Sequence, residues 1–140
     1  MSVLTNLAIH LRVAGALLLC VGLAHLILPR ALGWSVELQG VSLMTRQVSY
    51  VHTYFIGLMC GLFGVAAVGL TPDLLTRDRM AAALLVGGVA VWGSRLVVEL
   101  FVFDSSLWRG STATVLGHLA LTGLWTYETL VFASALARQL

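Results

Sequence analysis

Four ionisable residues of this sequence lie about one turn inside the ends of long apolar stretches. They are His25, His52, Glu99 and His118. If each stretch crosses a membrane and the crossings alternate in direction, all four lie roughly 5–8 Å from the same membrane face, at 1.5 Å per helical residue. Imidazole and carboxyl groups transfer protons, and they also bind transition metals. We call these residues the far-side group.

Further polar and aromatic residues repeat at helical spacing around the far-side group. One stripe comprises Trp92, Arg95 and Glu99 (i, i+3, i+7), and another comprises His118, Thr122, Trp125 and Thr129 (i, i+4, i+7, i+11). Polar stripes of membrane helices normally face the interior of a helix bundle. We therefore expect both stripes to face other helices of the protein.

One interpretation of the far-side group is acid–base chemistry on a lipophilic substrate that enters from the bilayer. Glu99 would be a carboxylic acid, Arg95 its orienting cation, and His118, His52 or His25 the partner acid or base. The residues expected to contact the substrate are Trp92, Tyr50, Tyr54, Trp125 and Arg46, with Trp34 and Trp108 as further parts of an aromatic wall.

A second interpretation is metal or haem binding, which would make the protein a redox subunit of a membrane. His25, His52 and His118 with Glu99 would form a three-histidine, one-carboxylate set for a transition metal. Alternatively, two histidines would hold haem, with Arg46 or Arg95 at its propionates. No pair of these ligands has the i, i+4 or i, i+3 spacing that would fix two of them on one helix.

A third interpretation is structural. Arg95 and Glu99 are spaced to form an i, i+4 ion pair, and each histidine can bond a backbone carbonyl or interfacial water. The protein would then be a non-catalytic accessory subunit of a larger membrane complex. The sequence leaves these alternatives open, and with them the question of whether the protein is an enzyme.

The elements that position these residues follow from the composition. Of the 140 residues, 59% are hydrophobic and 10% are charged, and the mean hydropathy is +0.97. Such a composition excludes an ordinary soluble domain, a disordered chain and a nucleic-acid-binding protein. Stretches 7–28, 49–70, 80–103 and 113–136 each supply the roughly 20 apolar residues of a membrane span. We predict a single domain, an all-α integral membrane four-helix bundle with both termini on the same side.

The first stretch has no basic residues before it, so we expect a retained helix rather than a cleaved signal peptide. Pro29-Arg30 is expected to end this helix. The connection at 29–48 is long for a bundle. It is expected to lie at the membrane interface, where Trp34 would be favourable; a lid over a site is the alternative.

Two further features concern contacts between helices. The Gly57-x-x-x-Gly61 pattern allows close approach of another helix, either of this chain or of a second subunit, in a homo-oligomer or a larger membrane complex. Gly87 and Gly88 would allow the same close approach on the third span. Arg12 and Glu128 are expected at overlapping depths in the membrane if the first and last helices are antiparallel neighbours. This predicts an ion pair between the two helices; a role in a proton relay is the alternative.

The arginines give an orientation. Arg77, Arg79 and Arg138, with Arg12 as a fourth, lie toward the side of the termini, and Arg30, Arg46 and Arg109 lie toward the other side. By the positive-inside rule, we expect cytoplasmic termini in a bacterial-type inner membrane.

Overall fold

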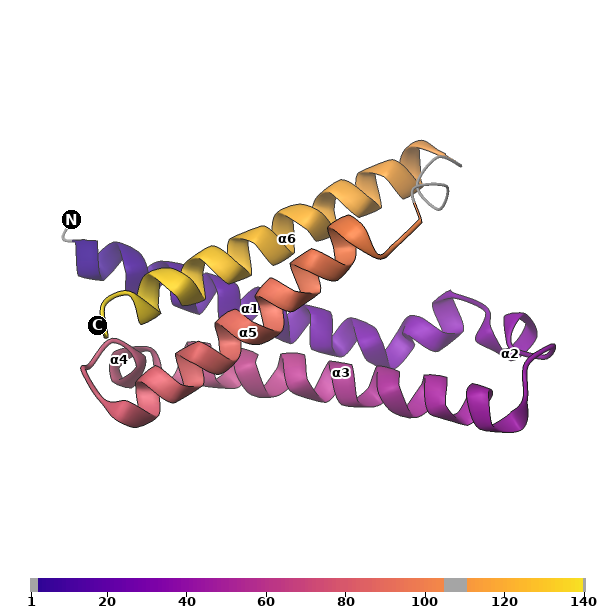
Figure 1. Ribbon diagram of the computed structural model, residues 1–140, viewed down its shortest axis with the longest axis horizontal. Helices are drawn as coiled ribbons and strands as arrows, with labels where there is room; N and C mark the ends of the chain where they lie inside the picture. Colours follow the sequence, from indigo (N-terminus) through magenta and orange to yellow (C-terminus); the bar gives the residue numbers. More distant parts are fainter. Residues whose placement is uncertain (1–2, 105–110, 140) are drawn as a thin grey trace. The chain divides into compact units, whose positions relative to one another are not determined.

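The computed structural model describes residues 3–104 and 111–139, in which the chain forms four long helices (Figure 1). The long helices are α1 (Val3–Ala31), α3 (Leu43–Gly69), α5 (Arg79–Phe101) and α6 (Thr112–Leu136). Two short helices, α2 (Trp34–Glu37) and α4 (Thr71–Leu74), lie in the connections. The predicted all-α four-helix fold is confirmed.

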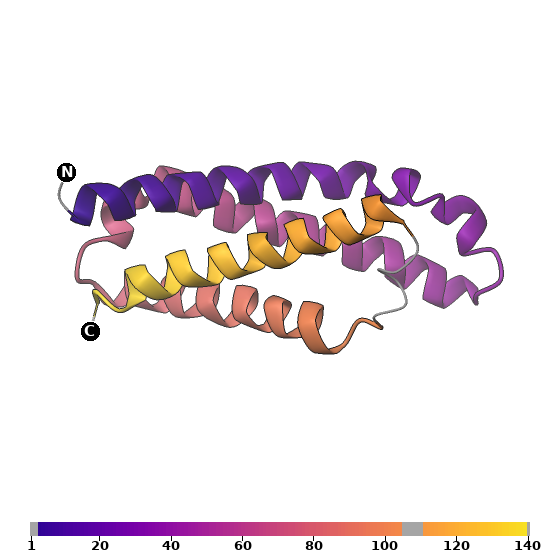
Figure 2. The same cartoon turned by 90° about the horizontal axis from the view of Figure 1, so that it is seen from above.

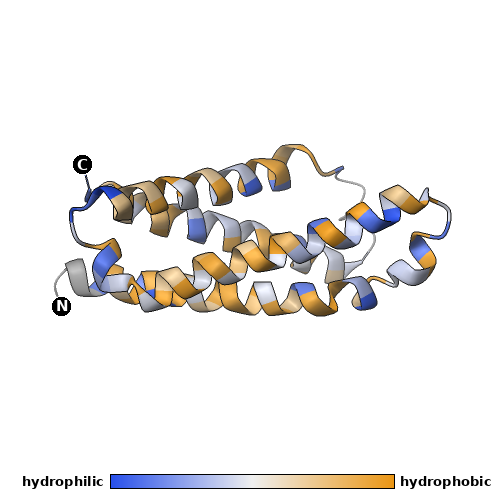
Figure 3. Cartoon of the chain, turned by 90° about the horizontal axis from the view of Figure 1, so that it is seen from below, coloured by the Kyte–Doolittle hydropathy of each residue, from blue (hydrophilic) through white to orange (hydrophobic). Residues whose placement is uncertain are grey.

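Each long helix is long and apolar enough to cross a membrane. The candidate spans contain 26, 27, 23 and 25 residues, more than the roughly 20 that a bilayer requires. Figure 3 shows hydrophobic residues along these helices and hydrophilic residues mainly at their ends and in the connections. The protein is therefore a multi-pass integral membrane protein whose helices contact the bilayer.

The end of α1 differs from the prediction. The helix continues through Pro29 to Ala31 instead of ending at Pro29-Arg30. One more helical bond forms beyond the proline, from Leu32 N to Leu28 O at 2.9 Å. The helix terminates where Gly33 adopts a φ of 62°, a left-handed conformation that glycine adopts without strain and that commonly ends helices.

The start of α3 also differs, since the helix begins at Leu43 rather than near residue 49. Ser42 caps it: its hydroxyl accepts a hydrogen bond from Thr45 N at 3.2 Å. A serine N-cap satisfies a backbone N–H that would otherwise lack a partner. The connection predicted at 29–48 is consequently reduced to residues 32–42 and contains α2.

The chain divides into two compact units. Arg12–Leu70 form the α1–α3 unit; Met1–Leu11 together with Thr71–Leu140 form the α5–α6 unit. The start of α1 and the end of α6 both belong to the α5–α6 unit and lie at the same end of it (Figure 2). There, the Gln139 amide donates to Leu74 O at 2.9 Å.

Glycine pairs bring α1 and α3 into close contact. A Cβ atom on Gly64 would lie 2.8 Å from the backbone oxygen of Gly15, and one on Gly57 would lie 2.8 Å from the Cβ of His25. A Cβ on Gly61 would meet nothing within 4 Å. The predicted close approach at Gly57 is therefore within this chain, and Gly64 takes part in it as well. The backbone of Gly61 also lies against α1, since a Cβ on Gly22 would lie 3.2 Å from Gly61 N.

This packing predicts different effects for two alanine substitutions on α3. Gly64→Ala forces a methyl group against the α1 backbone, so we expect a loss of about 1–3 kcal/mol, the usual cost of overpacking. Gly61→Ala should be neutral or slightly stabilising, because alanine favours the helix and the space is open. Unfolding of both variants in mixed detergent micelles, followed by circular dichroism, measures the difference. Equal unfolding midpoints would contradict this account of the α1–α3 contact.

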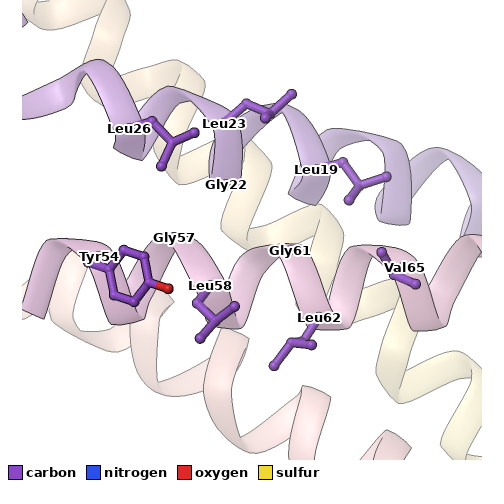
Figure 4. A pocket seen from close by; sticks show the side chains of 10 residues that line it. All are labelled: Leu19, Gly22, Leu23, Leu26, Tyr54, Gly57, Leu58, Gly61, Leu62 and Val65. Carbon is purple, nitrogen blue, oxygen red and sulfur yellow. The ribbon is translucent and has the colours of Figure 1, made fainter.

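An apolar groove of about 390 Å³ runs along one side of the α1–α3 pair (Figure 4). Gly22, Gly57 and Gly61 line it where the helices lack side chains, and leucines and Val65 line the rest. Tyr54 supplies the phenol group at one end.

Candidate functional site

The α5–α6 unit places a buried carboxyl group beside an imidazole. Glu99 lies in the last turn of α5 and His118 in the second turn of α6, so the two antiparallel helices bring them together. The Nδ1 atom of His118 lies 2.9 Å from Oε1 of Glu99. Glu99 is only 1% exposed. Since a carboxylate oxygen accepts, Nδ1 carries the proton of this hydrogen bond.

Arg95 approaches the same carboxylate from one turn earlier on α5. Its Nη1 lies 2.9 Å from Oε2 of Glu99, with the two side chains 31% and 0% exposed. The guanidinium N–H is not aligned for a hydrogen bond, so this contact is electrostatic. The i, i+4 ion pair predicted from the sequence is confirmed, and it gives the buried carboxylate a counterion.

Aromatic rings enclose the Arg95 guanidinium. Its Cζ lies 5.2 Å from the centre of the Trp125 ring and 5.5 Å from that of Phe103. Trp92 stacks on Trp125 with centroids 5.6 Å apart and planes at 9°. Cation–π contacts of this kind hold an arginine in place. Phe103 is not among the residues predicted from the sequence, although its i+4 position after Glu99 was the available signal.

These positions change the expected roles. The Glu99 side chain is 0% exposed and its two carboxyl oxygens already contact His118 and Arg95, whereas the His118 side chain is 23% exposed. His118 is therefore the candidate for a reacting group, and Glu99 is the candidate for a positioning residue. We call Glu99, His118, Arg95, Trp92 and Trp125 the α5–α6 site.

The other predicted site residues belong to the α1–α3 unit. His25 Nδ1 donates to Val21 O at 2.8 Å, and His52 Nδ1 donates to Val48 O at 2.9 Å. His52 also lies about 140° around α3 from Gly57, which faces α1. Each of these two imidazoles therefore bonds the backbone of its own helix.

The aromatic and basic residues predicted on α3 lie elsewhere in the same unit. Tyr50 packs edge-on against Trp34 with centroids 5.5 Å apart, and Tyr54 lines the apolar groove. Arg46 lies in the first turn of α3. Trp108 and Arg109 are outside the described residues. Grouping of the α1–α3 residues with the α5–α6 site remains a prediction.

In the part of the chain that the structure describes, no three His, Cys, Asp or Glu side chains gather closely enough to hold a metal ion. The four proposed ligands are divided between the units: His25 and His52 are in one, and Glu99 and His118 are in the other. A metal or haem site formed by all four remains a prediction.

Comparisons with known proteins found no matching family model, no matching curated protein and no matching solved structure.

The stacked guanidinium predicts that lysine cannot replace Arg95. Arg95→Lys keeps the charge but loses the planar group that lies against Trp125, so we expect a loss of about 0.5–2 kcal/mol, the range for cation–π contacts. The unfolding midpoint in mixed micelles measures the loss. Arg79→Lys, at the exposed start of α5, is the matched control and should leave the midpoint unchanged. An Arg95→Lys midpoint equal to that of the control would contradict the proposed stacking.

Proposed function

We propose that the α5–α6 site performs acid–base chemistry on a lipophilic substrate that enters from the bilayer. The observation that carries this proposal is the 2.9 Å contact between His118 Nδ1 and the buried carboxylate of Glu99. A carboxylate that orients an imidazole through Nδ1 is a recurring arrangement for proton transfer.

In this mechanism His118 exchanges the proton and Glu99 positions it. The hydrogen bond at Nδ1 fixes the neutral ring in one tautomer, so Nε2 carries the lone pair that takes a proton from the substrate. The imidazolium formed is stabilised by the adjacent carboxylate, and Nε2 then returns the proton. Arg95 favours the ionised form of Glu99 that this step requires.

The surroundings support a substrate with an apolar body and a hydrogen-bond acceptor. Thr122 follows His118 by one turn, and Trp125 follows by two. Thr122 Oγ1 and Trp125 Nε1 are buried and have no hydrogen-bond partner among the described residues. Buried polar groups in a membrane protein normally have partners. A carbonyl or hydroxyl oxygen of the substrate can accept from these two donors.

Mass spectrometry of lipids tests this function. Purified protein in nanodiscs made from a bacterial total lipid extract should convert at least one lipophilic compound. His118→Asn should abolish the conversion, and Glu99→Gln should lower it about 10²–10⁴-fold, the usual contribution of general acid–base catalysis. Conversion that persists in folded His118→Asn protein would refute the proposal. Loss of conversion in His52→Asn protein would show that the site extends to α3.

The accessory-subunit alternative depends on Gly57 and Gly61 facing away from the rest of the chain. Gly57 instead packs against Gly22 and His25 of α1, and Gly61 borders the groove. At Gly57, the surface that a second subunit would need is therefore already covered by α1 of the same chain. We therefore favour the acid–base function.

We also propose that the termini lie in the cytoplasm of a bacterial inner membrane. Arg77 and Arg138 lie together at one end of the α5–α6 unit, where Arg77 Nε donates to Arg138 O at 3.3 Å. Arginines concentrated at one membrane face favour the cytoplasmic side. A carboxy-terminal fluorescent fusion should fluoresce, and a carboxy-terminal alkaline phosphatase fusion should be inactive; the reverse pattern would overturn this orientation.

A further inference from the structure

A second buried carboxyl group, Glu128, takes no part in the α5–α6 site. It lies about two turns before the end of α6 and is 0% exposed. Neither of its carboxyl oxygens has a hydrogen-bond partner among the described residues. Glu99, in contrast, contacts both His118 and Arg95. The two buried glutamates therefore have different environments within one unit.

The surroundings of Glu128 in its own unit contain few ionisable groups. The contacts of Gly88 with Phe132 and of Trp92 with Trp125 show which part of α5 lies at the depth of Glu128. This part, residues 88–92, contains no ionisable side chain. On α6 itself the neighbour is Tyr127. The hydroxyl of Tyr127 lies 3.0 Å from Nδ1 of His10, the ionisable residue contributed by the first turns of α1.

These surroundings favour a neutral Glu128. Burying an ionised carboxylate without a partner is prohibitively costly in an apolar interior. Metal cations need several oxygen ligands, and among the described residues no three His, Cys, Asp or Glu side chains gather closely enough to hold one. A proton needs no coordination shell. We propose that Glu128 is an intramembrane proton-binding site, held as a carboxylic acid, that is independent of the proposed chemistry at His118.

The alternative is the ion pair between Arg12 and Glu128 that the sequence predicts. Arg12 belongs to the α1–α3 unit and Glu128 to the α5–α6 unit. The alternatives differ in charge: the ion pair requires a carboxylate, whereas the proton site requires the acid. The experiment below distinguishes them by the charge of Glu128.

Nuclear magnetic resonance of the glutamate carboxyl carbons provides the test. The chain contains three glutamates, Glu37, Glu99 and Glu128, so selective ¹³C labelling gives three reporters. In the full-length protein in bicelles at neutral pH, Glu128 should give the shift of a protonated acid. Glu37, exposed at the end of α2, and Glu99, paired with Arg95, are internal controls and should give carboxylate shifts.

Two variants complete the test. Glu128→Gln should remove the signal of the protonated acid and leave the unfolding midpoint unchanged, because glutamine resembles the neutral acid. Arg12→Gln should leave the Glu128 signal where it is. A carboxylate shift for Glu128 in the wild-type protein would overturn the proposal. If that signal then moved to the acid position in Arg12→Gln, the ion pair would be shown instead. Both results are independent of lipid conversion at His118.

Discussion

Glu99→Leu is expected to destabilise the protein by about 3 kcal/mol. Removing one partner of a buried ion pair leaves the other charge uncompensated, which typically costs about 3–5 kcal/mol. We expect the lower end because the Arg95 side chain remains 31% exposed. The substitution also removes the acceptor of His118 Nδ1. Unfolding in mixed micelles, followed by circular dichroism, measures this loss.

The double variant Arg95→Met/Glu99→Leu tests whether the two residues stabilise the protein as a pair. Replacing both partners removes the uncompensated charge, so most of the stability should return. A double variant that is as unstable as the sum of the two single variants would show that the residues act independently. That result would contradict the ion pair as the counterion arrangement of Glu99.

Gly88→Ala is expected to cost about 1–3 kcal/mol, the range for overpacking a core. A Cβ atom on Gly88 would contact Cδ1 of Phe132 and lie 2.7 and 2.9 Å from Cε1 and Cγ of the same ring. Phe132 is only 1% exposed, so the ring has little room to move. The strain should separate α5 from α6, the pair of helices that carries the α5–α6 site.

Gly93→Ala is the matched control on the same helix. A Cβ atom there would meet only Cγ2 of Thr129 at 3.8 Å, an ordinary van der Waals contact. Because alanine favours the helix over glycine, this variant should be neutral or slightly more stable than wild type. Unfolding in mixed micelles compares the two variants, and similar midpoints would contradict the close packing of α5 on Phe132.

The fold was predictable because a membrane span needs roughly 20 consecutive, mostly apolar residues, and such stretches can be recognised in the sequence. The helix ends were less predictable. Pro29 suggested the end of α1, yet a proline near a helix terminus tolerates another turn, and Gly33 ends the helix. α3 starts at the Ser42 cap, which is a local hydrogen bond. The hydropathy pattern assigns this part of the chain to a connection, so it did not predict a helix start there.

The α5–α6 site was partly predictable, because its residues follow helical spacing on two neighbouring helices. The stripes containing Glu99 and His118 meet as expected. The roles were not predictable: spacing places residues on a face but does not say which side chain is covered. The buried position of Glu99 is the reason why we propose His118 as the reacting group. Phe103 continues the stripe at i+4 from Glu99, but a phenylalanine among other apolar residues does not stand out in the sequence.

The glycine contacts show another limit of pattern reasoning. Gly57 was predicted to allow close approach, and it does. Its partners on α1 were not predictable, because a small-residue pattern on one helix does not identify the surface that it meets. Gly15 and Gly22 became meaningful only once α1 was seen to lie against α3.

The central claim is that Glu99 holds the His118 imidazole through Nδ1 inside the membrane. The most direct measurement is ¹⁵N nuclear magnetic resonance of the histidine rings in bicelles, with His118 assigned by its absence from the His118→Asn spectrum. We predict that the neutral His118 ring carries its proton on Nδ1, with a strongly hydrogen-bonded proton signal that disappears in Glu99→Leu. A neutral ring protonated on Nε2, or a spectrum unchanged by Glu99→Leu, would contradict the account.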